Sequence, residues 1–228
     1  MKRDYLYSTP YTILQKENMY HFNSDSELLG RFCRIEKEDT VLDIGTNNGV
    51  LLHYASLHEP RAMCGIDLFP EVIETARENL AYNHLEAELQ VTPLQEFEHE
   101  PFSCILCNPP FFTTQREDLK SENPYRRAAR FTDTLSIHDL FLHAARLSCQ
   151  TGRLSVIYPH SFMQEVLETA SSNQFFLTRL QAVYDQKGGE VRRCLMEFSK
   201  EKKDTLEVMP IAWLNRLHES RSRHRHTG

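Results

Sequence analysis

The chain has 228 residues, of which 40% are hydrophobic and 25% charged, and its formal net charge at pH 7 is −6. This length suits one well-cored domain of α/β size, and the negative charge argues against a general polyanion binder. No apolar run approaches the ~20 residues of a membrane helix and the N-terminal segment has no signal-peptide core, so the sequence predicts a cytoplasmic protein without a membrane segment.

Residues 1–35 are predicted to form an aromatic-rich lead-in and then a helix that begins at about Ser26. The first strong strand is Thr40–Ile44, which runs into a glycine turn, Gly45–Gly49, and then a helix with one buried face. A strand, a glycine turn and a helix open a nucleotide-binding α/β fold. Glycine lets a ligand approach the main chain, and Asn47 belongs to a type that tolerates left-handed backbone angles.

A carboxylate ends the second predicted strand. The strand Ala62–Asp67 places Asp67 about 20 residues beyond the glycine turn, where a ribose-hydroxyl acceptor belongs in this fold. The alternative role of Asp67 is an N-cap for the helix that starts at Pro70. Glycine turn and carboxylate together predict a site for an adenosine-type cofactor.

A short stretch near the middle of the chain carries the most specific pattern. The apolar strand 104–107 is followed by Asn108, Pro109 and Pro110, and then by Phe111 and Phe112. Prolines cannot continue a strand ladder, so the strand is predicted to end in a rigid loop lined by rings. A fixed amide, a fixed carbonyl and a stacking surface suit recognition of a flat, hydrogen-bonding ring such as a nucleobase. We take this loop as the candidate active site.

Cys104 and Cys107 have the C-x-x-C spacing of some redox and zinc sites. Successive strand residues alternate between the two faces of a sheet, so residues three positions apart point in opposite directions, and no second ligand pair at zinc spacing follows. The sequence therefore favours buried free thiols over a redox pair, and predicts no metal site.

Residues 113–134 show no clear periodicity, and they include several basic side chains that are diluted by acidic ones. Connections this long inside a compact domain are typically lids, binding loops or disordered segments. A basic loop directly after a base-stacking loop is where RNA phosphates would be met, here by Arg126, Arg127 and Arg130. A merely solvated loop is the alternative interpretation.

The remaining elements complete an alternating pattern of strands and helices. They are a strand at 88–91, a helix from Ile137, a strand at 153–158, a helix from Phe162 and a closing hairpin at 177–184 and 193–199. This pattern predicts an α/β fold, a doubly wound Rossmann-like sheet of seven strands that is mostly parallel with one antiparallel strand near the edge. We expect a lead-in at 1–35, the main domain at 36–200 and a charged, partly disordered tail at 201–228.

Three motifs follow one another in order: V-L-D-I-G-T-x-x-G at 41–49, then Asp67, then Asn108-Pro109-Pro110-Phe111. Their order and spacing resemble the class I S-adenosylmethionine-dependent methyltransferases that act on amino nitrogens. The flanking motifs His21-Phe22-x-Ser24-Asp25-x-x-x-Leu29 and Arg127-Ala128-Ala129-Arg130-Phe131-Thr132-x-Thr134-Leu135 are narrower matches. They look like the bacterial family that methylates the adenine exocyclic amine beside the anticodon of valine tRNA. The resemblance spans about residues 18–200.

The resemblance implies S-adenosylmethionine as cofactor and tRNA as substrate. The cofactor-binding residues that it implies are Ser24, Asp25, Asp43, Gly45, Thr46, Asn47, Gly49, Asp67, Leu68, Gln95 and Asn108. The catalytic residues that it implies are Asn108, Pro109, Pro110 and Phe111, and the RNA contacts are Phe112, Arg126, Arg127 and Arg130. Phe112 could equally be a core residue.

Two departures from the family pattern stand out. Asn47 replaces the usual middle glycine of the turn. Pro93 lies near the place of the acid that usually bonds the cofactor's adenine amine, and Gln95 or Glu96 is the candidate substitute.

Alternatives from two function classes remain at this point. The Asn-Pro-Pro-aromatic loop also serves glutamine-amide methylation in release factors and guanine-amine methylation in ribosomal RNA. A cofactor-binding module that scaffolds RNA without turnover is the non-enzymatic alternative. We expect Asn108 and the Pro109 carbonyl to accept both hydrogens of an adenine amine, which leaves the lone pair of that amine facing the methyl group.

Overall fold

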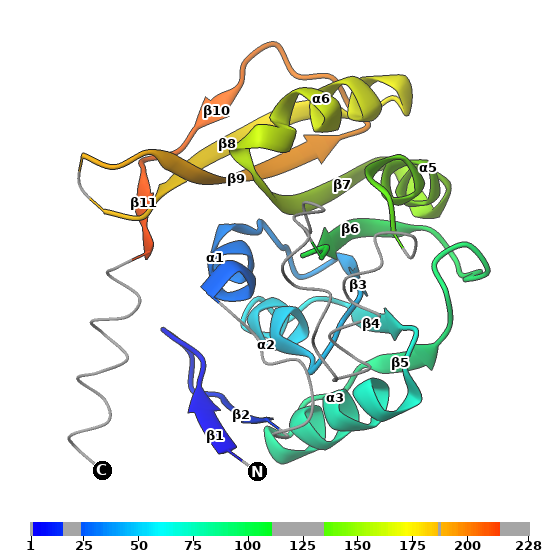
Figure 1. Ribbon diagram of the computed structural model, residues 1–228. Helices are drawn as coiled ribbons and strands as arrows, with labels where there is room; N and C mark the ends of the chain where they lie inside the picture. Colours follow the sequence, from blue (N-terminus) through cyan, green and yellow to red (C-terminus); the bar gives the residue numbers. More distant parts are fainter. Residues whose placement is uncertain (1, 16–23, 111–134, 187, 215–228) are drawn as a thin grey trace, which may run out of the picture.

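The computed structural model describes residues 2–15, 24–110, 135–186 and 188–214. The described residues form a nine-stranded sheet with helices on both faces, together with a two-stranded sheet (Figure 1). The large sheet has the order β10-β8-β9-β7-β6-β3-β4-β5, and β11 pairs with β8. Its strands are β3 (Thr40–Ile44), β4 (Ala62–Asp67), β5 (Glu88–Val91), β6 (Phe102–Cys107), β7 (Ser148–Pro159), β8 (Phe176–Tyr184), β9 (Val191–Ser199), β10 (Glu207–Val208) and β11 (Ala212–Trp213).

The directions of the strands confirm the predicted fold class. β9 is antiparallel to its neighbours β7 and β8, and the other neighbouring pairs of the described sheet are parallel. The seven predicted strands are all present as β3 to β9. The prediction missed β10 and β11, which lie in the segment expected to be a charged tail. Each has two residues, which is too short for a burial pattern to show in the sequence.

A short N-terminal hairpin was also missed by the sequence reading. β1 (Lys2–Tyr5) pairs antiparallel with β2 (Thr12–Gln15). An isolated pair of four-residue strands is marginal in water, so this hairpin depends on what it packs against. It is hydrogen-bonded to α3 (Pro70–Tyr82), which follows β4, and Ile13 shares a small core with Val50 and Tyr54.

The helices divide between the two faces of the large sheet. α1 (Ser24–Phe32) and α2 (Val50–Ser56) share a core with β3, β6 and β7 on one face, and α3 is next to α2 on that side (Figure 1). α5 (Ile137–Leu147), the 3₁₀ turn His160–Phe162 and α6 (Met163–Ser172) cover the other face. No helix in the described ranges is both long and apolar enough to cross a membrane.

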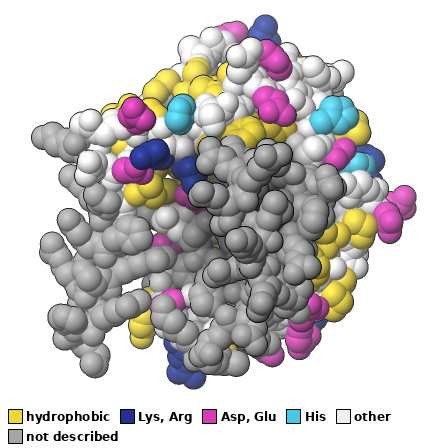
Figure 2. Space-filling model, in the orientation of Figure 1, with side chains coloured by type: hydrophobic (Ala, Val, Ile, Leu, Met, Phe, Trp, Pro, Cys, Tyr) yellow, Lys and Arg dark blue, Asp and Glu magenta, His cyan; other side chains and the backbone are white. Residues whose placement is uncertain are grey.

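Acidic and basic side chains are interspersed on the described part of the face drawn in Figure 2. This surface shows no broad field of one sign among the described residues. Contacts to a polyanion would therefore come from local groups of basic residues, as the net charge of −6 already indicated.

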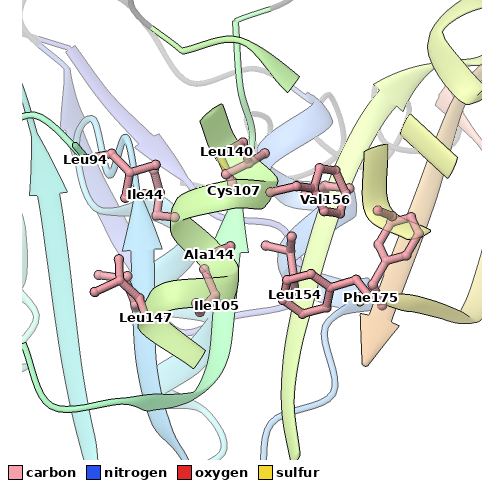
Figure 3. Close-up of a cluster of buried hydrophobic side chains, with 14 of the residues drawn as sticks. Ile44, Leu94, Ile105, Cys107, Leu140, Ala144, Leu147, Leu154, Val156 and Phe175 are labelled. Atoms are coloured by element: carbon pink, nitrogen blue, oxygen red, sulfur yellow. The ribbon is translucent and has the colours of Figure 1, made fainter. Parts of the chain in front are cut away.

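The larger core lies between α5 and the middle of the sheet. In Figure 3, Leu140, Ala144 and Leu147 of α5 lie against side chains of the central strands, including Ile105 and Leu154. Their spacing of three and four residues puts them on one face of the helix. A fully buried leucine stabilises the fold by about 1.5–3 kcal/mol, so this stripe is what fixes α5 against the sheet.

The two cysteines of the C-x-x-C motif belong to cores on opposite faces of the sheet. Cys107 packs in the core beneath α5, whereas Cys104 packs in the core beneath α1 and α2. Both are free thiols, and burial raises the pKa of each far above its ordinary value. They cannot chelate one ion together, and they serve as packing groups.

One buried amide fastens the N-terminal hairpin to the domain. Asn79 of α3 accepts the Leu14 N–H at 2.8 Å and donates to the Leu14 carbonyl at 3.2 Å. Its Nδ2 also donates to the Asn48 carbonyl at 3.0 Å, inside the glycine turn. Asn79 is fully buried, so water cannot replace these bonds when the side chain is removed.

We predict that Asn79→Ala lowers the free energy of unfolding by about 2–4 kcal/mol, because backbone groups of Leu14 and Asn48 lose a fully buried partner. Urea denaturation followed by circular dichroism measures this. The matched control is Asn173→Ala, because the Asn173 side chain is half-buried and, among the described residues, donates to a single group, the nearby Thr169 carbonyl. It should change stability by at most about 1 kcal/mol. Equal effects of both variants would contradict the anchoring role of Asn79.

Candidate active site

Three parallel strands end at the same level of the sheet. Ile44 of β3 lies opposite Ile66 of β4 on one side and opposite Cys107 of β6 on the other. The residues that follow these positions, Gly45, Asp67 and Asn108, therefore meet at one edge. This edge is the carboxyl end of the strands at the point where the order reverses between β3 and β6, which is where open α/β sheets bind ligands.

The glycine turn has the left-handed backbone that the sequence predicted. The φ angles are +69° at Gly45, +50° at Asn47 and +82° at Gly49. The N–H groups of Gly45 and Thr46 both donate to the Ile66 carbonyl, at 3.0 and 2.9 Å. A Cβ added at Gly45 would meet no atom within 4 Å, so the outer side of the turn is open to a ligand.

Asp67 ties the end of β4 to the glycine turn. Its Oδ2 accepts the Asn47 N–H at 3.1 Å and its Oδ1 accepts the Phe69 N–H at 3.3 Å. The N-cap residue of α3 is Phe69, so the alternative role of Asp67 as the N-cap is wrong. Burial raises the pKa of Asp67, although backbone N–H groups oppose this shift.

Asp43 is a fully buried carboxylate directly beneath the turn. Its Oδ2 accepts a hydrogen bond from Thr46 Oγ1 at 2.7 Å, and its Oδ1 has no partner among the described residues. Burial raises the pKa of Asp43 to about 7, and the nearby Asp67 adds to the shift. Among the described residues no cationic side chain contributes to either pKa shift, so Asp67, and Asp43 once it ionises, place negative charge at this end of the sheet.

A neutral histidine supports the turn from the side of α2. His53 is fully buried, and its Nδ1 donates to the Gly49 carbonyl at 2.7 Å. Asn83 donates to the other ring nitrogen at 3.0 Å, and burial lowers the pKa of His53. His53, Asn79 and Asn83 were not predicted as functional. The available signal was that Asn79 lies on the buried stripe of α3, between apolar residues.

On the β6 side of the point where the strand order reverses, the start of α1 contacts the proline loop, Asn108 to Pro110. Asn108 Nδ2 donates to Ser26 Oγ at 2.9 Å. Pro109 is buried and Pro110 is half-buried, so the loop backbone is packed as well as restricted by its rings. Ser26 was predicted only as the approximate start of a helix, not as a contact of Asn108.

The other predicted site residues differ in their surroundings. Asp25 is buried and accepts from Arg193 Nε at 3.0 Å, and the Thr46 hydroxyl is engaged by Asp43, so neither side chain points freely into the site. Ser24 is half-buried as the first residue of α1.

Leu68, which follows β4, and Gln95, which follows β5, are both exposed. The backbone of the loop after β5 is held by Arg146, which donates to the Leu94 and Phe97 carbonyls. Phe111, Phe112, Arg126, Arg127 and Arg130 lie outside the described residues.

Comparison with known proteins identifies the family to which the chain belongs. Residues 12–123 match the Methyltransferase small domain family. A tRNA1(Val) (adenine(37)-N6)-methyltransferase of Aliivibrio salmonicida is 30% identical over 181 residues, which cover 78% of this chain and 76% of that protein. The chain belongs to the class I S-adenosylmethionine-dependent methyltransferases.

Further similarities agree with this assignment. The methyltransferase of the same description from Christiangramia forsetii is 27% identical over 207 residues, covering 86% of this chain and 84% of that protein. The crystal structure of the ribosomal protein L11 methylase from Lactobacillus delbrueckii subsp. bulgaricus superimposes with a TM-score of 0.61 at 17% identity, covering 82% of this chain and 83% of that one. At this identity the likeness concerns the fold alone.

The methyl donor of this methyltransferase is S-adenosylmethionine, and the described residues fit it. The open outer side of Gly45 leaves room for a ligand against the main chain. The unpaired oxygen of Asp43 and the raised pKa values of Asp43 and Asp67 mark a place where negative charge lacks a partner among the described residues. A cationic sulfonium compound supplies that partner.

We predict that Asp43 makes stability depend on pH. The unfolded chain ionises Asp43 near its ordinary pKa of 3.8, whereas the folded, ligand-free chain keeps the proton up to about pH 7. The contribution of this group to stability is therefore greatest below the lower value, and it falls by about 1.4 kcal/mol per pH unit between the two values. Above the higher value it is constant.

Asp43→Asn cannot ionise, so its stability relative to the wild type should rise as pH increases through this window. Denaturation curves at a series of pH values between about 5 and 8 measure the difference. Asp204→Asn, an exposed position in the 201–206 segment, is the control and should follow the wild-type profile. If the Asp43→Asn and wild-type profiles are parallel, Asp43 does not carry the proton.

Proposed function

We propose that this methyltransferase transfers a methyl group to the exocyclic amine of an adenine in tRNA, next to the anticodon of valine tRNA. The observation that carries the proposal is the position of Asn108, which follows β6 at the level of the glycine turn and is held there by Ser26. The relatives from Aliivibrio salmonicida and Christiangramia forsetii are tRNA1(Val) (adenine(37)-N6)-methyltransferases, which supports the choice of adenine and of tRNA.

The donor half of the proposed site consists of the glycine turn and the carboxylate after β4. Gly45, Asn47 and Gly49 would hold the cofactor against the main chain, and Asp67 would accept from its ribose hydroxyls. Asp43 would balance its positive charge through the buried oxygen that has no partner in the described part of the chain. S-adenosylmethionine supplies, when bound, a methyl group already activated by its sulfonium sulfur.

The acceptor half has to turn a poor nucleophile toward that methyl group. The lone pair of an adenine amine is delocalised into the ring. Asn108 Oδ1 and the Pro109 carbonyl would accept its two hydrogens, which favours a pyramidal nitrogen whose lone pair points away from both acceptors. Pro109 and Pro110 have fixed φ angles and no N–H donors, so the two acceptors stay in place. No side-chain base is needed, because the amine becomes acidic as it is methylated.

The RNA-facing part of the proposal rests on residues outside the described ranges. Phe111 would stack on the adenine, an interaction worth ~1–3 kcal/mol at other base-binding sites. Arg126, Arg127 and Arg130 would meet phosphates, and Phe112 is assigned to the same RNA surface. The mixed charge of the described surface fits such a local contact better than a broad one (Figure 2).

Asn108→Ala should lower the rate of tRNA methylation at least about 100-fold while cofactor affinity changes little, because only the acceptor amine uses its oxygen. The assay is methyl transfer from labelled cofactor to bulk tRNA, ribosomal RNA and protein, followed by mass spectrometry of the nucleosides. Wild-type product should be N6-methyladenosine in tRNA. Labelling of ribosomal RNA or of protein instead would show that tRNA is not the substrate. If the wild type labels none of them, the protein would be a cofactor-binding scaffold and not an enzyme.

Asp67→Ala should weaken cofactor binding about 10- to 100-fold, because a carboxylate that accepts from the ligand is lost. Isothermal titration calorimetry with S-adenosylmethionine measures this affinity. Asp204→Ala removes an exposed carboxylate of the same size and should leave it unchanged. An unaltered affinity in Asp67→Ala would reduce Asp67 to a residue that shapes the turn through the Asn47 and Phe69 N–H groups.

A further inference from the structure

Helix α1 is anchored at both ends by arginines of the C-terminal hairpin. At its start, Asp25 accepts from Arg193 Nε of β9 at 3.0 Å, and this carboxylate is buried. At its end, Arg179 of β8 donates to the Phe32 carbonyl at 2.9 Å, and its guanidinium lies 4.6 Å from the centre of the Phe32 ring. Both contacts join α1 to strands that lie far from it in the sequence.

Close packing on α2 restrains the middle of the same helix. A Cβ added at Gly30 would lie 2.4 Å from the ring of Tyr54, so α1 approaches α2 as closely as a glycine allows. The Tyr54 hydroxyl in turn donates to the Tyr7 carbonyl at 2.8 Å. α1 is therefore held by β8 and β9 at its two ends and by α2 along its second half.

Ser26 lies in the first turn of α1, and its hydroxyl is on the side of the active site. It is one residue beyond Asp25, and its Oγ accepts from Asn108 Nδ2 at 2.9 Å. The nitrogen and oxygen of an amide are attached to the same carbon and point in different directions. A fixed Nδ2 therefore fixes Oδ1, and none of the described residues donates to that oxygen.

We propose that Ser26 is a positioning residue, whose hydroxyl holds the Asn108 amide so that Oδ1 faces the amine to be methylated. This inference rests on the proposed role of Asn108. A serine hydroxyl can also donate, so Ser26 restrains the plane of the amide rather than one orientation alone. The N–H groups of the amine then select the orientation in which Oδ1 faces them, because an amide turned by half a rotation would oppose them with its own N–H groups. A freely rotating amide would spend part of its time in that unproductive orientation.

Ser26→Ala should lower kcat for tRNA methylation roughly five- to tenfold, the value of one hydrogen bond to an amide, with the KM for S-adenosylmethionine within about twofold of the wild type. Ser26→Thr keeps the hydroxyl and should restore most of kcat. The matched control is Ser172→Ala, which removes a helical serine hydroxyl whose partner in the described part of the chain is the Glu168 carbonyl on α6. An unchanged kcat in Ser26→Ala, or equal losses of kcat and cofactor affinity, would overturn the proposal.

A second measurement needs no substrate. The side-chain amide of Asn108 gives a pair of ¹⁵N–¹H signals, identified by their loss in Asn108→Asp. They should shift and exchange faster with water in Ser26→Ala, and stay near their wild-type positions in Ser26→Thr and Ser172→Ala. Unshifted signals in Ser26→Ala would overturn the proposal. If the signals shift in Ser26→Ala but the wild-type enzyme does not methylate tRNA, the contact between Ser26 and Asn108 stands and only the proposed substrate is wrong.

Discussion

Ile44 lies opposite both Ile66 and Cys107, and the site depends on this register of β3 with β4 and β6. Slipping a strand by one residue would turn each of its side chains to the other face. Both faces of β6 are packed, with Ile105 and Cys107 in one core and Cys104 and Leu106 in the other. A slip would therefore disrupt two cores at once. Hydrophobic packing inside the sheet thus decides that the glycine turn, Asp67 and the proline loop meet at one level.

The register alone does not hold the turn in shape. Its three residues with positive φ include Asn47, and such a conformation is unfavourable for a residue with a side chain. Tertiary hydrogen bonds offset this: Asp67 accepts the Asn47 N–H, His53 donates to the Gly49 carbonyl and Asn79 donates to the Asn48 carbonyl. Because Asn79 also bonds Leu14, the N-terminal hairpin and the glycine turn share one buried amide. Loss of the hairpin would leave polar groups beneath the turn without partners.

Local patterns in the sequence predicted the features that depend on neighbouring residues. Strand periodicity located the seven longer strands of the sheet, and the expected tolerance of asparagine for left-handed angles agrees with the φ of +50° at Asn47. The missed contacts join residues that are distant in sequence. Asn79 and Leu14 are separated by 65 positions, Asn108 and Ser26 by 82, and Arg193 and Asp25 by 168. No periodicity links such pairs, because they meet only after the sheet order has been formed.

The two halves of the site differ in charge, and this difference bears on what each can contribute to the proposed reaction. Asp67, and Asp43 once it loses its proton, make the donor side negative, whereas the acceptor side presents the neutral groups Asn108, Pro109 and Pro110. Methyl transfer moves positive charge from the donor toward the acceptor amine. Carboxylates on the donor side therefore stabilise the bound ground state at least as well as the transition state, which strengthens binding without accelerating the chemical step. Acceleration then has to come from alignment by the neutral half. On the proposed role of Asn108, the arginines of β8 and β9 that hold α1 therefore serve the rate through alignment of the Asn108 amide and not through charge.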